Sequence, residues 1–306
     1  MRVAAIDQGT NTTRLLVADV DRDQIDEVVK RTRITRLGEG VDTRRQLLPL
    51  PMARVRNCLT EYRRELESLG AERTLLVATS AVRDAENGEA FLGEIEWSYG
   101  FATRLLSGDE EAELTLRGVG ETGRSTVVVD IGGGSTELIG SDQRVSLDIG
   151  SVRLTERHLP SDPPTETELE ACAAAVRSVL PDGLRPDRAI GVAGTITSLA
   201  ALDLALAEYD PERVHGHRLT LGGIQQQLSR LAAMPLAERR QVPALDPDRA
   251  PVIVAGAVIL REVLAHFRLE EIVASERDIL HGAALEAAAL PEPVEGDAPP
   301  GAYTCC

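Results

Sequence analysis

Apolar positions along the first 120 residues follow two alternating periods, and this alternation predicts a sheet covered by helices. Short runs rich in Val, Ile and Leu, separated by polar turns, are typical of strands. From Met52 to Leu69 the apolar residues recur every three or four positions, which predicts an amphipathic helix ended by Gly70. The expected strands are 2–7, 14–20, 25–34, 73–79 and 101–106, and the expected helices are 52–69, 87–97 and 109–116. Alternation of this kind indicates an α/β domain.

A similar pattern starts again after a polar break at 121–124. Strands are expected at 188–193 and 271–274, and helices at 166–180, 196–206, 221–234, 248–267 and 277–289. From Pro291 the chain is rich in Pro, Glu and Gly, a composition that indicates disorder. We therefore expect an N-terminal domain over 1–122, a C-terminal domain over 123–290 and a disordered tail over 291–306.

Two segments of the chain repeat each other at a constant offset of 123 residues. Asp, Gly, Thr and Leu coincide without gaps when 7–15 is set against 130–138, and each segment follows a short apolar strand. A repeat on the scale of a domain predicts two halves of similar structure.

Each repeated segment has the composition of a hairpin with a glycine-rich tip. Glycine lets backbone N–H groups approach an anion closely, and Ser or Thr hydroxyls add donors. Two such tips would form a phosphate clamp, and the aspartate at each strand end could hold Mg²⁺ through waters. The predicted metal ligands are Asp7 and Asp130. The predicted phosphate-binding residues of the tips are Gly9, Thr10, Asn11, Gly132, Gly133, Gly134, Ser135 and Thr136.

Composition and charge narrow the classes of partner. The formal net charge is −16, which argues against nucleic acid or an anionic membrane as a partner, and aromatic residues are too few (3%) for base-stacking platforms. Lys30 is the only lysine, so almost every cationic contact must come from arginine, which suits bidentate phosphate recognition. No signal peptide, bilayer-spanning apolar run or CxxC motif is present, and the terminal Cys305-Cys306 pair is expected in a loose tail. We expect a reduced, cytoplasmic protein.

An ordered set of motifs resembles the Ppx/GppA phosphatase family, the exopolyphosphatases and guanosine pentaphosphate phosphohydrolases, in a short two-domain form. Thr10 stands where the family usually has Ser, and 278–282 departs from the family's Leu-Arg-Glu-Gly type of motif, which leaves the role of that segment open. The resemblance implies an α/β fold of two actin-like (ribonuclease H-like) domains with a cleft between them. The motifs that carry it are 7–12, 78–83, 107–112, 129–137, 194–195 and 249–256.

The resemblance also implies roles for individual residues. Glu111 matches the family's catalytic base, with the adjacent Glu110 as the alternative. Acids in the first turn after Ser107 are also typical of simple helix capping. Glu137 matches the family's second essential acid, which would hold the water or Mg²⁺. Arg83 is expected to bind phosphate by paired N–H donors, as is Arg14, for which a partly exposed strand position is an equal alternative. Gly194 and Thr195 are expected to line the cleft.

These features predict an enzyme that hydrolyses the terminal phosphoanhydride of inorganic polyphosphate with Mg²⁺ and releases orthophosphate. Hydrolysis of guanosine pentaphosphate (pppGpp) is the alternative within the same chemistry. Two further alternatives are an actin-like-fold kinase, which needs a cleft aspartate and an adenine pocket, and a non-catalytic module that binds polyphosphate or nucleotide. A homodimer fits the family. His215 and His217 lack nearby Cys or His partners in the sequence and are expected on a surface loop.

Overall fold

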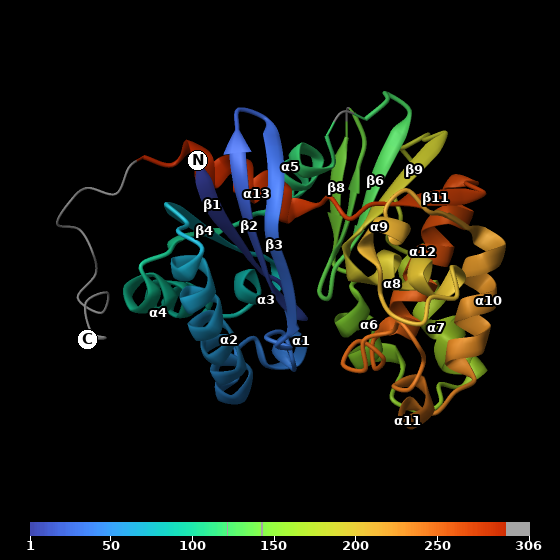
Figure 1. Ribbon diagram of the computed structural model, residues 1–306. Helices are drawn as coiled ribbons and strands as arrows, with labels where there is room; N and C mark the ends of the chain where they lie inside the picture. The colour runs from blue at the N-terminus through green and yellow to red at the C-terminus, as the bar shows by residue number, and fades with distance from the viewer. Residues whose placement is uncertain (121, 142, 292–306) are drawn as a thin grey trace. The chain divides into compact units, whose positions relative to one another are not determined.

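The computed structural model describes residues 1–120, 122–141 and 143–291, which divide into two compact units (Figure 1). Unit 1 comprises Met1–Gly120 together with the chain from Ile279 onward, and unit 2 comprises Glu121–Asp278. Unit 2 begins one residue before the predicted end of the N-terminal domain at 122. The chain returns to unit 1 at Ile279, before the predicted end of the C-terminal domain at 290. Beyond Pro291 the predicted tail, with Cys305 and Cys306, lies outside the described residues.

Unit 1 is built on a five-stranded mixed sheet in the order β3-β2-β1-β4-β5. The first three strands form an antiparallel meander, and β4 and β5 run parallel to β1. Successive residues of a strand point to opposite faces, so the unbroken apolar run of β1 predicts burial on both sides. The strands are β1 (Arg2–Gln8), β2 (Thr12–Asp21), β3 (Gln24–Ile34), β4 (Arg73–Ala78) and β5 (Ala102–Leu105).

Helices cover both faces of this sheet, and each face has its own core. Ala4 and Ile6 of β1 pack with α2 and α4, whereas the alternate residues Val3 and Ala5 pack with α5 and α13. The 52–69 periodicity is confirmed as the buried stripe of α2. The helices are α1 (Val41–Arg44), α2 (Pro49–Ser68), α3 (Ser80–Arg83), α4 (Gly88–Tyr99), α5 (Gly108–Val119) and α13 (Ile279–Ala289).

The last helix, α13, belongs to unit 1 although it follows unit 2 in the sequence. Its apolar residues, among them Leu280 and Ala284, are buried against the unit 1 sheet and α5. Gly282 makes this packing possible, since a Cβ there would lie 2.0 Å from the carbonyl oxygen of Leu114 on α5. The segment whose role the sequence left open therefore docks the final helix onto the first unit.

Replacing Gly282 by Ala is expected to destabilise the protein by about 2–3 kcal/mol, because the added methyl overpacks a backbone contact that cannot shift alone. Gly93→Ala is the matched control: Gly93 is exposed on α4, and nothing lies within 4 Å of its Cβ position. That control should stabilise the protein slightly through helix propensity. Urea unfolding measures both, and equal midpoints for the two variants would contradict the packing role of Gly282.

Unit 2 repeats the strand order of unit 1. Its six-stranded sheet has the order β10-β11-β9-β6-β7-β8, with β6, β7 and β8 antiparallel and β9 parallel to β6. The run β8-β7-β6-β9-β11 thus corresponds to β3-β2-β1-β4-β5, which confirms two actin-like (ribonuclease H-like) domains. The strands are β6 (Thr126–Ile131), β7 (Thr136–Ile139), β8 (Arg144–Leu147), β9 (Arg188–Val192), β10 (Arg218–Thr220) and β11 (Glu271–Ala274).

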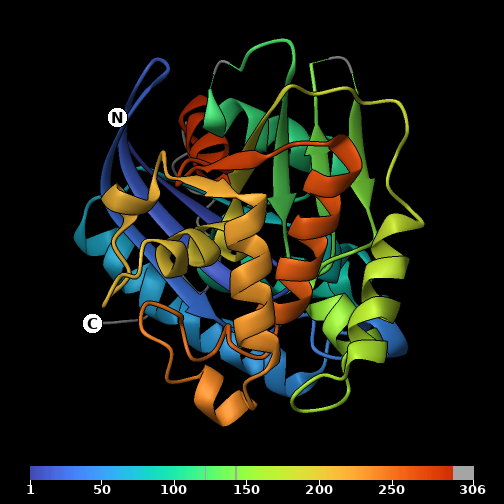
Figure 2. The same cartoon turned by 90° about the vertical axis from the view of Figure 1, so that its right-hand side faces the viewer.

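The core of unit 2 centres on α12, which is buried along most of its length. It lies side by side with α10 and α7 in one layer of helices (Figure 2). The pattern at 248–267 predicted this helix, although it begins only at Ile253, beyond Pro251. The helices are α6 (Ser151–His158), α7 (Glu166–Arg177), α8 (Ala193–Asp203), α9 (Pro211–Val214), α10 (Leu221–Ala232), α11 (Leu236–Arg239) and α12 (Ile253–Phe267). Across the described part of the chain, every helix is too short or too polar to cross a bilayer.

The predicted internal repeat is visible in the register of the two hairpins. Asp7 pairs with Arg14 across β1 and β2, and Asp130 pairs with Glu137 across β6 and β7. Both partners of each pair are 123 residues from their counterparts. The tips also close alike: the amide of the first glycine donates to the carbonyl three residues later, at 2.9 Å in the first hairpin and 3.0 Å in the second.

Candidate active site

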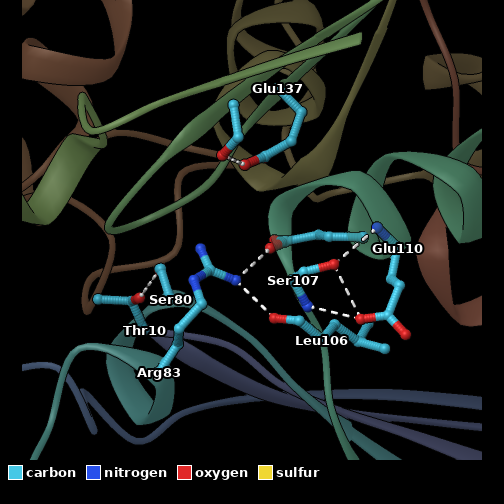
Figure 3. Close-up of polar contacts among 9 residues, drawn as sticks. Thr10, Ser80, Arg83, Leu106, Ser107, Glu110 and Glu137 are labelled. Carbon is cyan, nitrogen blue, oxygen red and sulfur yellow. Dashed lines mark hydrogen bonds and ion pairs between the residues drawn. The ribbon is translucent and has the colours of Figure 1, made fainter.

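The first hairpin tip is held by polar contacts at the carboxyl ends of β1 and β4. The hydroxyl groups of Thr10 and Ser80 are 2.8 Å apart, which joins the tip to the start of α3 (Figure 3). Thr10 and Asn11 are both buried. Within the described residues the side-chain nitrogen of Asn11 has no hydrogen-bond acceptor. A buried amide donor without a protein acceptor is expected to meet a ligand or water, which fits the predicted phosphate site.

Asp7 and Arg14 form an ion pair at the base of this tip. Nε and Nη2 of Arg14 donate to the same oxygen of Asp7 at 2.9 and 2.6 Å. The two predicted roles therefore compete, because the carboxylate expected to hold Mg²⁺ already accepts from the arginine expected to hold phosphate. The pair neutralises the base of the first tip.

Arg83 and Glu111 meet where α3 approaches the start of α5. Nη1 of Arg83 donates to the carbonyl of Leu106 at 2.7 Å and lies 3.4 Å from Oε2 of Glu111 (Figure 3). Glu111 is 8% exposed although it stands in the first turn of a helix. An arginine beside a buried carboxylate favours its ionised form. Ser80, in contact with Thr10, and Arg83, in contact with Glu111, are the two ends of α3.

Glu110, the alternative base, has a different task. Its Oε2 accepts from the backbone N–H and the hydroxyl of Ser107, both at 2.8 Å, while Ser107 Oγ accepts from the Glu110 amide (Figure 3). This is a complete capping box. These bonds, chiefly from the Ser107 backbone, together with Arg104, hold the pKa of Glu110 below its usual value. Glu110 therefore caps the helix, whereas the adjacent Glu111 is the buried acid beside Arg83.

The second hairpin carries two facing acids where the first carries an ion pair. Asp130 and Glu137 are direct cross-strand neighbours and are 7% and 1% exposed. Oε1 of Glu137 accepts from the hydroxyl of Ser146 on β8 at 2.8 Å (Figure 3). Like charges directly opposite each other are unfavourable in a sheet. A divalent cation would relieve that repulsion.

The donor chemistry of this second hairpin fits Mg²⁺, which is bound through one or two carboxylates and keeps several waters. Asp130 and Glu137 supply two carboxylates, and the described residues contain no set of three or more acids, histidines or cysteines arranged to enclose a metal. Mg²⁺ here would thus depend on water and substrate oxygens as further ligands. Asp7 fits the ion less well because it is engaged by Arg14.

Gly194 and Thr195 lie in the first turn of α8, directly after β9. Strand β9 is the neighbour of β6 in the sheet. A Cβ on Gly194 would lie 2.2 Å from the guanidinium carbon of Arg249, so this glycine makes room for that arginine. Arg249 is the first residue of the 249–256 motif, and the sequence alone assigned it no role. It is the only charged residue of that motif, which was the available indication that it has a specific function.

The two histidines of the 215–217 segment pair with local groups. Nε2 of His217 lies 2.8 Å from a carboxylate oxygen of Asp203, and the Nδ1 of His215 accepts from the Glu276 backbone at 3.2 Å. His215 is exposed, as expected for a surface loop. These contacts account for both rings without a metal.

The chain is similar to known proteins over most of its length. The model of the Ppx/GppA phosphatase family matches residues 16–289. Exopolyphosphatase 2 of Mycobacterium tuberculosis is 40% identical, with 94% of this chain and 98% of that protein covered. The guanosine-5'-triphosphate,3'-diphosphate pyrophosphatase of Aeromonas hydrophila is 29% identical over 87% of this chain and 55% of that protein. The crystal structure of an exopolyphosphatase-like protein has a TM-score of 0.87 and 35% identity, covering 94% of this chain and 98% of that one.

Proposed function

Because the chain belongs to the Ppx/GppA phosphatase family, we propose that it hydrolyses the terminal phosphoanhydride of inorganic polyphosphate and releases orthophosphate. The observation that carries the proposal is the buried Glu111, ion-paired with Arg83 and relieved of capping by Glu110. A buried, ionised carboxylate that has no task in capping its helix is suited to general-base chemistry.

In this reaction Glu111 accepts a proton from the attacking water as the water oxygen bonds to the terminal phosphorus. The bond to the bridging oxygen breaks, and the shortened chain leaves with the electron pair of that bond. Arg83, whose Nη1 lies 3.4 Å from Oε2 of Glu111, orients that carboxylate. In unit 1, the loop amides of the first hairpin and the Asn11 side chain donate to phosphate oxygens, so that negative charge on the transferring group is stabilised.

Mg²⁺ would be held by Asp130 and Glu137, and when bound it would neutralise charge on the phosphate oxygens. Ser146 orients Glu137 through its 2.8 Å hydrogen bond. Arg249, set against Gly194, adds a cationic donor in unit 2. Substrate binding thus rests on a few arginines and a metal rather than on a basic surface, which reconciles the net charge of −16 with a polyanionic substrate.

Removal of divalent metal is expected to abolish phosphate release, because the two facing acids would then repel the substrate as well as each other. Phosphate release from polyphosphate is measured after dialysis against a chelator, and again after Mg²⁺ is added back. Activity should return with added Mg²⁺. Undiminished activity in the metal-free protein would contradict the role given to Asp130 and Glu137.

Hydrolysis of pppGpp is the second candidate, and the similarity to the Aeromonas hydrophila pyrophosphatase favours it. The same base and the same phosphate-binding loops would serve both reactions. Ratios of kcat/KM for short polyphosphate, long polyphosphate and pppGpp decide between them, and polyphosphate is expected to be preferred. Release from none of the three would refute hydrolysis, whereas phosphate transfer from ATP to a hydroxyl acceptor would favour a kinase.

A further inference from the structure

Three consecutive carbonyl groups of the second hairpin tip point toward one short helix, α6. They accept hydrogen bonds from the first turn of that helix. The bonds run from Ser151 N to Gly132 O (2.9 Å), from Val152 N and Arg153 N to Gly133 O (2.8 and 3.1 Å), and from Arg153 Nε to Gly134 O (2.7 Å).

Fixing these carbonyls also fixes the direction of the loop amides. In a trans peptide the C=O and the N–H of the next residue point to opposite sides. Carbonyls bonded to α6 therefore aim the amides of Gly133, Gly134 and Ser135 away from it. Successive amides on one side of a loop form an anion-binding concavity. The first turn of α6 thus shapes the donor face of the loop.

The glycine that precedes α6 permits this close approach. A Cβ on Gly150 would lie 2.3 to 2.5 Å from backbone atoms of Gly133 and Gly134. Its φ of −135° is accessible to any residue, so contact with the loop, and not backbone conformation, requires glycine here.

Arg153 adds a charged side-chain donor to the backbone braces, whereas the Ser151 hydroxyl donates to the Gly132 carbonyl as a neutral group at 3.2 Å. Arg153 is 9% exposed, and its Nε holds the third carbonyl of the loop, that of Gly134. A hydrogen bond from a charged donor is stronger than a neutral one, and it polarises the peptide so that the amide of Ser135 becomes a better donor. The Arg153 side chain therefore controls the orientation of the Ser135 amide.

The first hairpin has a corresponding brace made of backbone alone. The amide of Gly38 donates to the Thr10 carbonyl at 2.8 Å, and the amides of Thr35 and Arg36 donate to the Asn11 carbonyl. A Cβ on Gly38 would lie 2.2 Å from the Thr10 methyl carbon. Both tips are thus held by the segment that follows β3 in unit 1 and β8 in unit 2, and unit 2 adds side-chain donors, of which Arg153 is the charged one.

We propose that Arg153 is a positioning residue for the phosphate-binding loop: by holding the Gly134 carbonyl it aims the Ser135 amide at a phosphoryl group of the substrate. The inference rests on the proposed function only for the identity of the substrate. Binding of a phosphoryl group by the loop can be measured without turnover.

Kinetics of Arg153→Met test the role against a matched control. Arg73→Met removes a comparable bond, since Arg73 Nη1 donates to the Ala288 carbonyl at 2.7 Å. Arg73 is the first residue of β4, and Ser80 and Arg83 follow the other end of that strand. R153M is expected to lower kcat/KM for polyphosphate about thirtyfold, largely through KM, because one loop donor is misdirected. R73M should lower stability without this effect, and R153K should recover part of the loss. Equal kcat/KM values for R153M and R73M would refute the positioning role.

A binding measurement separates this inference from the proposed function. Orthophosphate is titrated into protein labelled with ¹⁵N-serine, with the Ser135 amide signal assigned by its loss in S135A. Compared with the wild-type protein, the shift of this signal should reach half-saturation at about tenfold higher phosphate in R153M and about threefold higher phosphate in R153K. If R153M does not fold, the R153K result tests the inference. Unchanged half-saturation in these variants overturns the inference. Absence of turnover with every substrate would overturn the proposed function alone.

Discussion

Replacing Glu111 by Gln is expected to lower kcat for phosphate release from polyphosphate about a thousandfold, the size of effect typical for loss of a general base. Gln keeps the shape of the side chain and can still accept a hydrogen bond from Arg83, 3.4 Å away in the native protein, but it cannot take a proton from water. KM should change little, because the side chain acts on the water and not on the substrate. Initial rates with a defined polyphosphate give both constants.

Glu110→Gln is the matched control, the same change one residue earlier. It weakens the capping box with Ser107 and should lower the urea midpoint while kcat stays close to wild type. The hydrogen bonds from Ser107 and Arg104 lower the pKa of Glu110. The Glu110 carboxylate therefore stabilises the folded protein at neutral pH, and this stabilisation is lost as the pH falls through the lowered pKa. The stability difference between E110Q and wild type should therefore vanish in acid. If E110Q lost as much turnover as E111Q, the division of roles would be wrong.

The second large effect is expected for Glu137→Gln, which should lower turnover about a hundredfold and raise the Mg²⁺ concentration needed for half-maximal rate. Removing one of two facing carboxylates leaves Asp130 as the remaining acid of the pair. Ser146→Ala, which deletes the hydrogen bond that orients Glu137, should shift the Mg²⁺ dependence in the same direction but less. Rates measured across a Mg²⁺ titration give both results.

The control for E137Q comes from a capping glutamate of the same unit. Glu168 closes the capping box of α7 with Thr165 and is half-buried. Glu168→Gln should leave the Mg²⁺ dependence unchanged. The same half-saturating Mg²⁺ in E137Q and wild type would exclude Glu137 as a metal ligand.

Much of the site could be predicted from the sequence because it is local. The two tips repeat in sequence at a fixed offset, and hydrogen bonds between near neighbours set their geometry, so Asp7 and Asp130 fall in equivalent places. The choice between Glu110 and Glu111 could not be made this way. It depends on which of two adjacent acids turns back to Ser107 and which turns toward Arg83, and that follows from tertiary packing.

Other features were missed for identifiable reasons. Strand β8 and helix α6 are short, with four and eight residues, and the contacts of α6 with the loop involve glycine peptides distant in sequence. The periodicity of α13 predicted a helix, but periodicity does not say which sheet a helix covers. Contact with Leu114, through Gly282, decides that. The roles of Arg153 and Arg249 depend on close approach to glycine peptides distant in sequence.

The identity of the attacked phosphorus can be read directly from a single turnover of a polyphosphate of defined length in H₂¹⁸O. Attack by water on the terminal phosphorus places one ¹⁸O atom in the released orthophosphate and none in the shortened chain. Mass spectrometry of both products should show this distribution for the wild-type protein and no release on the same timescale for E111Q. Label in the shortened chain, or release that does not depend on Glu111, would contradict hydrolysis of the terminal phosphoanhydride by this residue.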